Sequence, residues 1–166
     1  MRIKQKKIIF SAIIFALLAG ILFRFTLYPK SPNLTLTTLD GQSIALDHLR
    51  GKPVIVTFWA TDCESCLKEI PVFLDLYSRY HSQGLEIIGV SMYYDPPNRV
   101  IEFHKQHSLP YPIVLDIDGT IAKAFENTRV TPTTFLLTPS GEIGWKKTGL
   151  FELTQIQPKI EAFLSQ

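Results

Sequence analysis

Three short stretches of the chain are continuously apolar and rich in β-branched residues, which predicts strands that are covered on both faces. Residues 54–60 are the most apolar of these stretches, residues 85–92 the second, and residues 113–117 a shorter third. Residues 133–138 and 142–148 flank a Pro-Ser-Gly turn and predict two further strands that pair antiparallel.

Helices are predicted between these strands. After the first strand, apolar residues recur at helical spacing, at Leu67, Ile70, Leu74 and Tyr77. Pro71 predicts a kink in this helix. The remaining pattern predicts a hairpin of strands 33–39 and 42–46 around an Asp-Gly turn, a short helical turn at 47–50, and helices at 99–107, 118–127 and about 153–164. This alternation predicts an α/β fold with a mixed sheet and helices on both faces.

The beginning of the chain follows a different pattern. Residues 8–23 carry no charge and are almost entirely apolar, four basic residues precede them, and Arg24 follows. With Arg24 at the interface, residues 8–28 reach the length of about 20 residues that a membrane-spanning helix needs. The basic residues favour a cytoplasmic N-terminus. Residues 1–30 are therefore predicted to be a single-pass anchor in the cytoplasmic membrane, and residues 31–166 a domain on its periplasmic, extracytoplasmic side.

A cleaved signal peptide has a similar start, but no Ala-x-Ala site precedes the predicted domain, which favours a retained anchor. The charge distribution agrees with this division. The chain has a net charge of +2, yet six of its 17 basic residues and none of its acidic ones fall within residues 1–30. The rest holds 11 basic and 15 acidic side chains. The predicted domain therefore has no basic excess, and nucleic-acid binding is not expected.

The chemistry of the predicted domain centres on Cys63-Glu64-Ser65-Cys66, which lies where the most apolar strand meets the following helix. A helix N-terminus presents unpaired N–H groups and a partial positive charge, and both stabilise a thiolate. The spacing allows the two thiols to form a small disulfide. We expect Cys63 to be the more exposed thiol that attacks a substrate, and Cys66 to resolve the mixed disulfide.

Other interpretations of the cysteine pair stay open at the level of spacing. The same spacing is half of a zinc site, although the chain has no other cysteine to complete one. A permanent structural disulfide is a second alternative, but so small a loop adds little stability. A third is copper(I) binding by the two thiols with His104 or His107 as a further ligand.

The segment from Trp59 to Cys66 resembles the active site of the thioredoxin superfamily, and in particular the TlpA/ResA-like membrane-anchored thiol-disulfide oxidoreductases. The resemblance extends to the hairpin turn, to Gly51-Lys52-Pro53, to Glu69, to Asp116-x-Asp118-Gly119 and to the segment from Val130 to Phe135. It implies a thioredoxin-like fold in which a central mixed sheet is flanked by helices, with an N-terminal β-hairpin and a central insertion.

The resemblance also implies roles for residues outside the cysteine pair. Pro132 matches the family's cis-proline, which faces the cysteines and leaves the Thr131 backbone free to pair with an extended substrate. Trp59 packs beside the site. Asp62 occupies the position of an aromatic residue that borders the substrate groove in the family, so its presence changes the choice of partner.

Glu69 follows Cys66 by three residues, so both lie on nearly the same face of the predicted helix. If it is buried, its pKa rises and it can exchange a proton with Cys66. Thr57 replaces the buried aspartate of many thioredoxins, which leaves Glu69 for that role. Together with Asp62 and Glu64, it places three carboxylates near the thiols, which predicts a reducing or weakly oxidising couple.

The sequence thus predicts an extracytoplasmic protein disulfide reductase without metal or cofactor beyond the Cys63–Cys66 disulfide. Its expected partners are client proteins with thiols or disulfides, among them apocytochrome c, and a membrane thiol-disulfide electron donor. The alternatives are a copper(I) chaperone and a non-catalytic redox-sensing module. A peroxiredoxin-type peroxidase is disfavoured, because Ala60 stands where that motif has a threonine.

Overall fold

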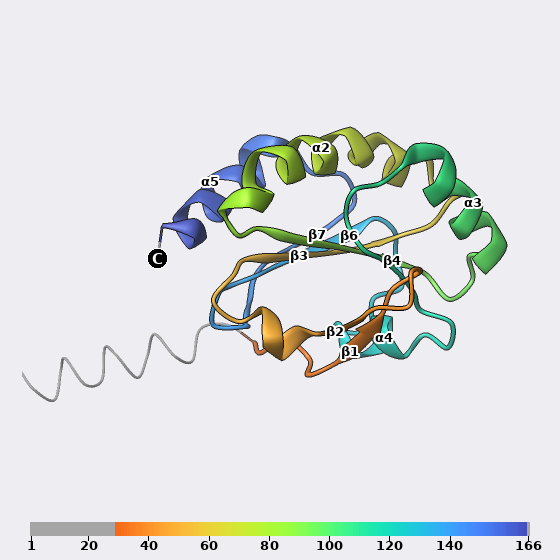
Figure 1. Cartoon of the computed structure of the whole chain (residues 1–166), viewed down its shortest axis with the longest axis horizontal. Helices are drawn as coiled ribbons and strands as arrows, with labels where there is room; N and C mark the ends of the chain where they lie inside the picture. Colours follow the sequence, from red (N-terminus) through yellow and green to blue (C-terminus); the bar gives the residue numbers. More distant parts are fainter. Residues whose placement is uncertain (1–28, 166) are drawn as a thin grey trace, which may run out of the picture.

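A computed structural model of the chain describes residues 29–165. Its centre is a five-stranded sheet (Figure 1) in the order β5-β4-β3-β6-β7. The strands are β3 (Val54–Trp59), β4 (Glu86–Ser91), β5 (Ile113–Leu115), β6 (Thr133–Leu137) and β7 (Ile143–Thr148). β3, β4 and β5 run parallel, whereas β6 pairs antiparallel with both β3 and β7. The predicted mixed sheet is confirmed.

Helices cover both faces of the sheet, as predicted. One face carries α2 (Glu64–Tyr80), which the 3-10 turn η2 (His81–Gln83) extends, together with α3 (Pro97–His107) and α5 (Leu153–Leu164). The other face carries the short helix α4 (Thr120–Ala124), the 3-10 turn η1 (Leu46–Leu49) and the hairpin of β1 (Thr35–Thr37) and β2 (Ser43–Ala45).

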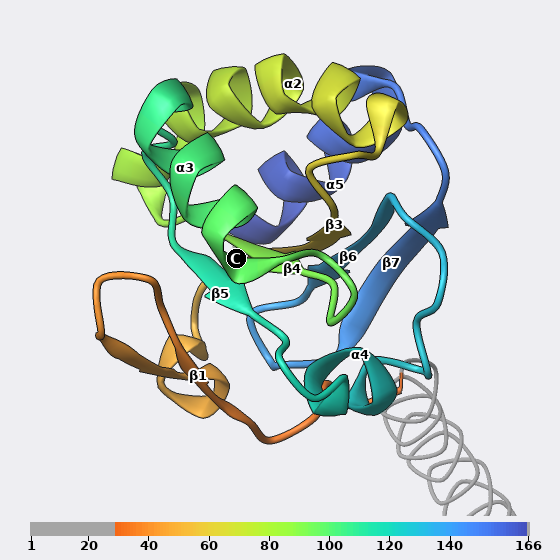
Figure 2. The same cartoon turned by 90° about the vertical axis from the view of Figure 1, so that its right-hand side faces the viewer.

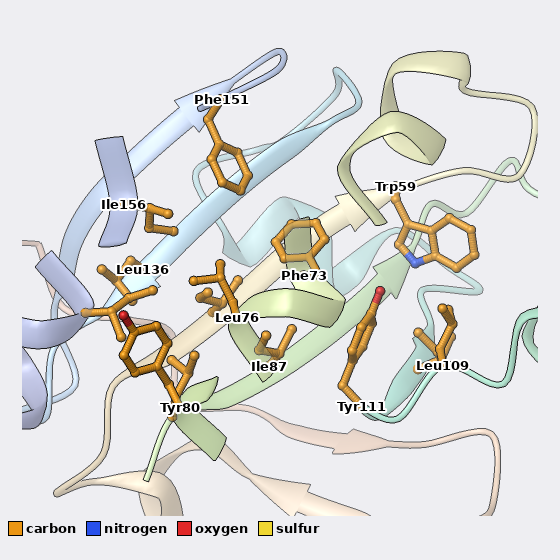
Figure 3. Close-up of a cluster of buried hydrophobic side chains, with 14 of the residues drawn as sticks. Trp59, Phe73, Leu76, Tyr80, Ile87, Leu109, Tyr111, Leu136, Phe151 and Ile156 are labelled. Atoms are coloured by element: carbon orange, nitrogen blue, oxygen red, sulfur yellow. The ribbon is translucent and has the colours of Figure 1, made fainter. Parts of the chain in front are cut away.

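The core has two layers, one on each face of the sheet, and β3 is therefore buried along its whole length. Ile55 and Trp59 face the helices α2, α3 and α5, whereas Val56 and Phe58 pack into the cluster on the opposite face. This alternation is the two-residue period of a strand. Because both faces of β3 are covered, residues of both sets must be apolar, which accounts for the continuous apolar run in the sequence. Figure 3 shows the first layer, in which Phe73 and Leu76 of α2 lie above the sheet.

Several predicted boundaries were wrong. Each strand of the hairpin has three residues, fewer than the sequence pattern predicts. The helix predicted at 118–127 begins at Thr120 and ends at Ala124, because the backbone turns left-handed at Glu126 and Asn127, with φ of 52° and 54°. Asparagine tolerates that conformation better than most residues, but the helical pattern gave no sign of it.

The predicted membrane segment 8–28 lies outside the described residues. Within residues 29–165, no helix has the length and apolar character needed to cross a bilayer. The described chain begins by pairing with the turn between β6 and β7: the Ile143 N–H donates to the Pro29 carbonyl, and the Ser31 N–H to the Gly141 carbonyl. The β6 register against β3 puts that turn at the end of the sheet opposite to the cysteine pair.

Candidate active site

The two cysteines form a disulfide where β3 passes into α2. Cys63 is the N-cap residue of α2 and Cys66 lies in its first turn, with their sulfurs bonded at 2.08 Å. Cys63 is half-buried and Cys66 is only 3% exposed. The structure therefore holds the pair in its oxidised form, with Cys63 as the sulfur that a partner reaches more easily.

The surroundings of Cys63 suit a thiolate. The backbone N–H of Cys66 donates a hydrogen bond to the Cys63 sulfur at 3.2 Å, and the Ser65 hydroxyl lies 3.4 Å from the same sulfur. N–H groups at a helix N-terminus stabilise a negative sulfur and lower its pKa. This geometry matches the attacking role predicted for Cys63, which stays a prediction until it is tested.

Glu69 is buried beneath the disulfide, with 1% of its surface exposed. Its Oε1 accepts a hydrogen bond from the Phe151 N–H at 3.1 Å, while no group within the described residues bonds its buried Oε2. Burial raises the pKa of Glu69 to about 7, and the Phe151 hydrogen bond opposes part of that rise. The carboxyl is thus poised to gain or lose a proton near neutral pH, as a general acid or base requires.

Glu69 and Cys66 line the same cavity of about 10 Å³. Its wall is completed by Thr57, Trp59, Ile70, Phe73, Gly89, Leu109 and Tyr111, several of which appear in Figure 3. Two residues of this wall each have a buried polar atom with no partner among residues 29–165, Trp59 Nε1 and Glu69 Oε2. The cavity has room for roughly one water molecule.

Gly89 of β4 makes this arrangement possible. A Cβ at position 89 would lie 2.8 Å from Ile113 Cδ1 and 3.3 Å from Trp59 Nε1. Trp59 itself is 6% exposed and packs on the Phe103 ring with centroids 5.3 Å apart. Trp59 therefore lies behind the disulfide in the core, and the substrate contact predicted for it stays a prediction.

The cis-proline loop reaches the same end of the sheet. The Thr131–Pro132 bond is cis, as the resemblance implies. Because β6 starts opposite the end of β3, the loop before it lies at the same end of the sheet as the turn that carries the cysteines. Within residues 29–165, the Thr131 backbone makes no hydrogen bond, and the Thr131 Oγ1 lies 3.3 Å from the Tyr94 hydroxyl. Thr131 thus offers an unpaired donor and acceptor to an extended chain.

The three carboxylates predicted near the thiols differ in their surroundings. Asp62 is exposed, and Glu64 is exposed and paired with Lys68 at 2.6 Å, which lowers the pKa of Glu64. Glu69 alone of the three is buried. Screening by water and by Lys68 weakens the effect of the two exposed carboxylates, so Glu69 carries most of the predicted influence on the thiols.

Sequence reasoning missed Asp95, which holds the loop before the cysteines. Asp95 is 5% exposed, and its two oxygens accept hydrogen bonds from the Thr61 N–H at 2.6 Å and the Thr61 hydroxyl at 2.7 Å. It comes from the loop after β4, which runs parallel to β3, so both loops meet at one sheet edge. Its position just after a predicted parallel strand was the feature of the sequence that could have marked it as a site residue.

Replacing Asp95 with asparagine is expected to lower the free energy of unfolding by about 1–2 kcal/mol, because one Thr61 hydrogen bond loses its acceptor. Thr61→Val should have a similar effect, and the double variant should add little to either. Denaturant unfolding measures all three. Asp75→Asn is the control, since its exposed pair with Arg79 contributes little. Additive losses at positions 61 and 95 would contradict the coupling.

No group of three or more histidine, cysteine or acidic side chains within the described residues is arranged to hold a metal ion. His107 stacks on Phe103 at 3.8 Å and has its Nδ1 2.9 Å from the Phe103 carbonyl oxygen, and the buried Nδ1 of His104 has no partner among the described residues. The copper(I) hypothesis therefore finds no third ligand in this part of the chain.

Comparisons with known proteins agree with this site. The model of the AhpC/TSA family matches residues 29–146. The thiol-disulfide oxidoreductase ResA of Geobacillus kaustophilus is 32% identical, over 98% of each chain, and ResA of Bacillus subtilis is 37% identical over 68% of this chain and 62% of its own. The crystal structure of StoA from Bacillus subtilis is 30% identical and superimposes with a TM-score of 0.65, over 77% of this chain and 97% of that one.

The fold and the disulfide define a thioredoxin-like protein, and the chain belongs to the AhpC/TSA family. Within it, the chain is a thiol-disulfide oxidoreductase of the ResA type, with Cys63 and Cys66 as its redox-active pair. The predicted family and enzyme class are confirmed.

Proposed function

We propose that this protein is an extracytoplasmic disulfide reductase, held at the cytoplasmic membrane by residues 8–28. The observation that carries the direction of the reaction is the buried Glu69, which shares a cavity with Cys66. A carboxylate near a thiol disfavours the thiolate, so the reduced pair is less stabilised and gives up its electrons more readily.

The reaction proceeds in two exchanges. The Cys63 thiolate attacks one sulfur of a client disulfide, that S–S bond breaks, and the other client sulfur leaves as a thiolate that takes up a proton. Cys66 then loses its proton to Glu69 and attacks the Cys63 sulfur, which releases the client's second thiol and re-forms the Cys63–Cys66 disulfide. Two electrons thus pass from the enzyme to the client, and a membrane dithiol donor returns the enzyme to its reduced form.

The location follows from the N-terminal pattern of four basic residues before an apolar stretch. The contacts of Pro29 and Ser31 support a tether that leaves the site open, because they lie at the end of the sheet opposite to Cys63. The clients we propose are extracytoplasmic proteins with oxidised cysteine pairs, including apocytochrome c before its haem is attached.

Location and direction can be tested together with a membrane-impermeant maleimide, which reacts only with reduced thiols that it can reach. In intact cells, Cys63 of the full chain is expected to be labelled because it is the more exposed of the two thiols, whereas the Cys63→Ser/Cys66→Ser variant stays unlabelled. Labelling that requires cell lysis would place the domain inside the cytoplasm. Labelling that requires an added reductant would mean that the pair is kept oxidised, which contradicts a reductase.

A further inference from the structure

Exposed apolar side chains gather at one end of the domain. Six large hydrophobic side chains are exposed within the described residues. Five of them lie in loops beyond the sheet and are between 46% and 65% exposed: Tyr93, Tyr94, Ile117, Val130 and Leu150. We call these five the apolar rim. The sixth, Ile101, lies on α3.

The strand directions bring the apolar rim to the end of the sheet that carries Cys63. β3, β4 and β5 are parallel, so the loops after them, with the cysteine turn, Tyr93-Tyr94 and Ile117, share one end. β6 is antiparallel and begins there, which adds Val130, and β7 ends there, which adds Leu150. Figure 2 looks onto this end of the sheet.

Contacts between these loops join the rim to the cis-proline loop. Tyr93 covers Gly119, where a Cβ would lie 3.3 Å from its ring, and it packs edge-on against Tyr94 with centroids 5.4 Å apart. The Tyr94 hydroxyl lies 3.3 Å from Thr131 Oγ1. The tyrosine pair therefore extends the surface beside the unpaired Thr131 backbone.

The other side of the cis-proline loop is continuous with the rim as well. Val130 precedes Thr131, and Leu150 follows Gly149, whose N–H donates to the Pro132 carbonyl at 2.8 Å. An exposed aromatic or aliphatic side chain gains free energy when a partner covers it, and several of them together mark an interaction surface.

We propose that the apolar rim binds the residues that flank the reactive cysteine of a client, and so selects clients whose cysteine lies beside an aromatic or large aliphatic residue in an extended segment. This inference rests on the proposed function. The rim borders the redox-active disulfide, where the client must deliver its sulfur, and Thr131 offers backbone groups to an extended chain. Both features fit a peptide segment better than a folded surface.

The test uses the full chain, reduced beforehand with dithiothreitol that is then removed, in single turnovers. The substrates are two peptides whose single cysteine carries glutathione as a mixed disulfide; one has tyrosine and leucine beside the cysteine, and the other serine and asparagine. Each turnover oxidises the Cys63–Cys66 dithiol and converts the mixed disulfide to peptide thiol and glutathione. The apolar peptide is expected to react about tenfold faster.

The variants locate the preference. Tyr93→Ser/Tyr94→Ser should bring the ratio of the two rates close to one, and Tyr94→Phe, which keeps the ring, should retain most of it. Ile101→Ser is the matched control, since Ile101 is exposed but lies outside the rim, and it should keep the wild-type ratio. Equal rates in the wild type, or a ratio that survives in the double variant or falls in Ile101→Ser, would overturn the inference.

Other occupants of the rim are separate outcomes. A wild-type dimer in light scattering that the double tyrosine variant turns into monomers would make the rim an interface between copies and overturn the inference. If wild type binds lipid vesicles and the double tyrosine variant does not, the rim is a lipid-binding surface and the inference is overturned. If wild type reduces glutathione disulfide no faster than Cys63→Ser does, the proposed function itself fails; if it does so but shows no peptide preference, only this inference fails.

Discussion

Cys63→Ser is expected to lose disulfide reduction by on the order of a thousandfold or more, because the one cysteine left, Cys66, is only 3% exposed and poorly placed to attack a client. A serine hydroxyl has no thiolate at neutral pH and forms no S–S bond with a client. Reduction of glutathione disulfide by the full chain measures the loss. A residual rate within tenfold of wild type would mean that Cys66 attacks clients directly.

Cys66→Ser should accumulate the mixed disulfide that Cys63→Ser cannot form. Cys63 can still attack, but the mixed disulfide is not resolved, so a client stays attached to Cys63. Separation of such adducts from cells on non-reducing gels, followed by mass spectrometry, should identify clients and confirm the bond to Cys63. Adducts that form with Cys63→Ser and not with Cys66→Ser would reverse the assigned roles. The greater exposure of Cys63 and the burial of Cys66 argue against that outcome.

The cysteine pair could be predicted because its signal is local. An apolar strand followed at once by a helical pattern fixes the position of both cysteines at the helix N-terminus, and the structure has them there. The helix 120–124 shows the limit of local pattern, since its early end depends on left-handed backbone at Glu126 and Asn127.

The rest of the site depends on contacts between distant residues. The spacing places Glu69 on the same face of α2 as Cys66, but its buried hydrogen bond comes from Phe151, which is 82 residues further along the chain in the loop before α5. Asp95 accepts a hydrogen bond from Thr61, 34 residues earlier in the chain, because the parallel strands β3 and β4 end side by side. Sequence patterns can point to single residues such as Glu69, but the order and direction of the strands decide which residues come into contact.

Glu69→Gln is expected to slow the resolving step by about a hundredfold near neutral pH, because glutamine keeps the shape but accepts no proton from Cys66. With the pKa of Glu69 at about 7, the wild-type rate should rise through neutral pH as the carboxylate forms, and the variant should lack that rise. Release of thiol from a preformed Cys63 mixed disulfide, followed across pH, measures this step. Glu64→Gln is the control, because Glu64 is exposed and paired with Lys68. A parallel loss in both variants would point to net charge instead of proton transfer.

The same carboxyl should make the stability of the oxidised domain depend on pH. Its pKa is about 7 in the folded chain against an ordinary value of 4.5, so the folded state binds more protons between these two values. Stability should therefore fall as pH rises from 4.5 to about 7 and stay reduced above it, by roughly 1–3 kcal/mol. Glu69→Gln removes this loss, so denaturant unfolding of the variant should show a gain over wild type that is larger above pH 7 than below 4.5. Unfolding curves that shift in parallel for both proteins would mean that Glu69 titrates at its ordinary pKa, and the carboxyl could then not exchange protons with Cys66 near neutral pH.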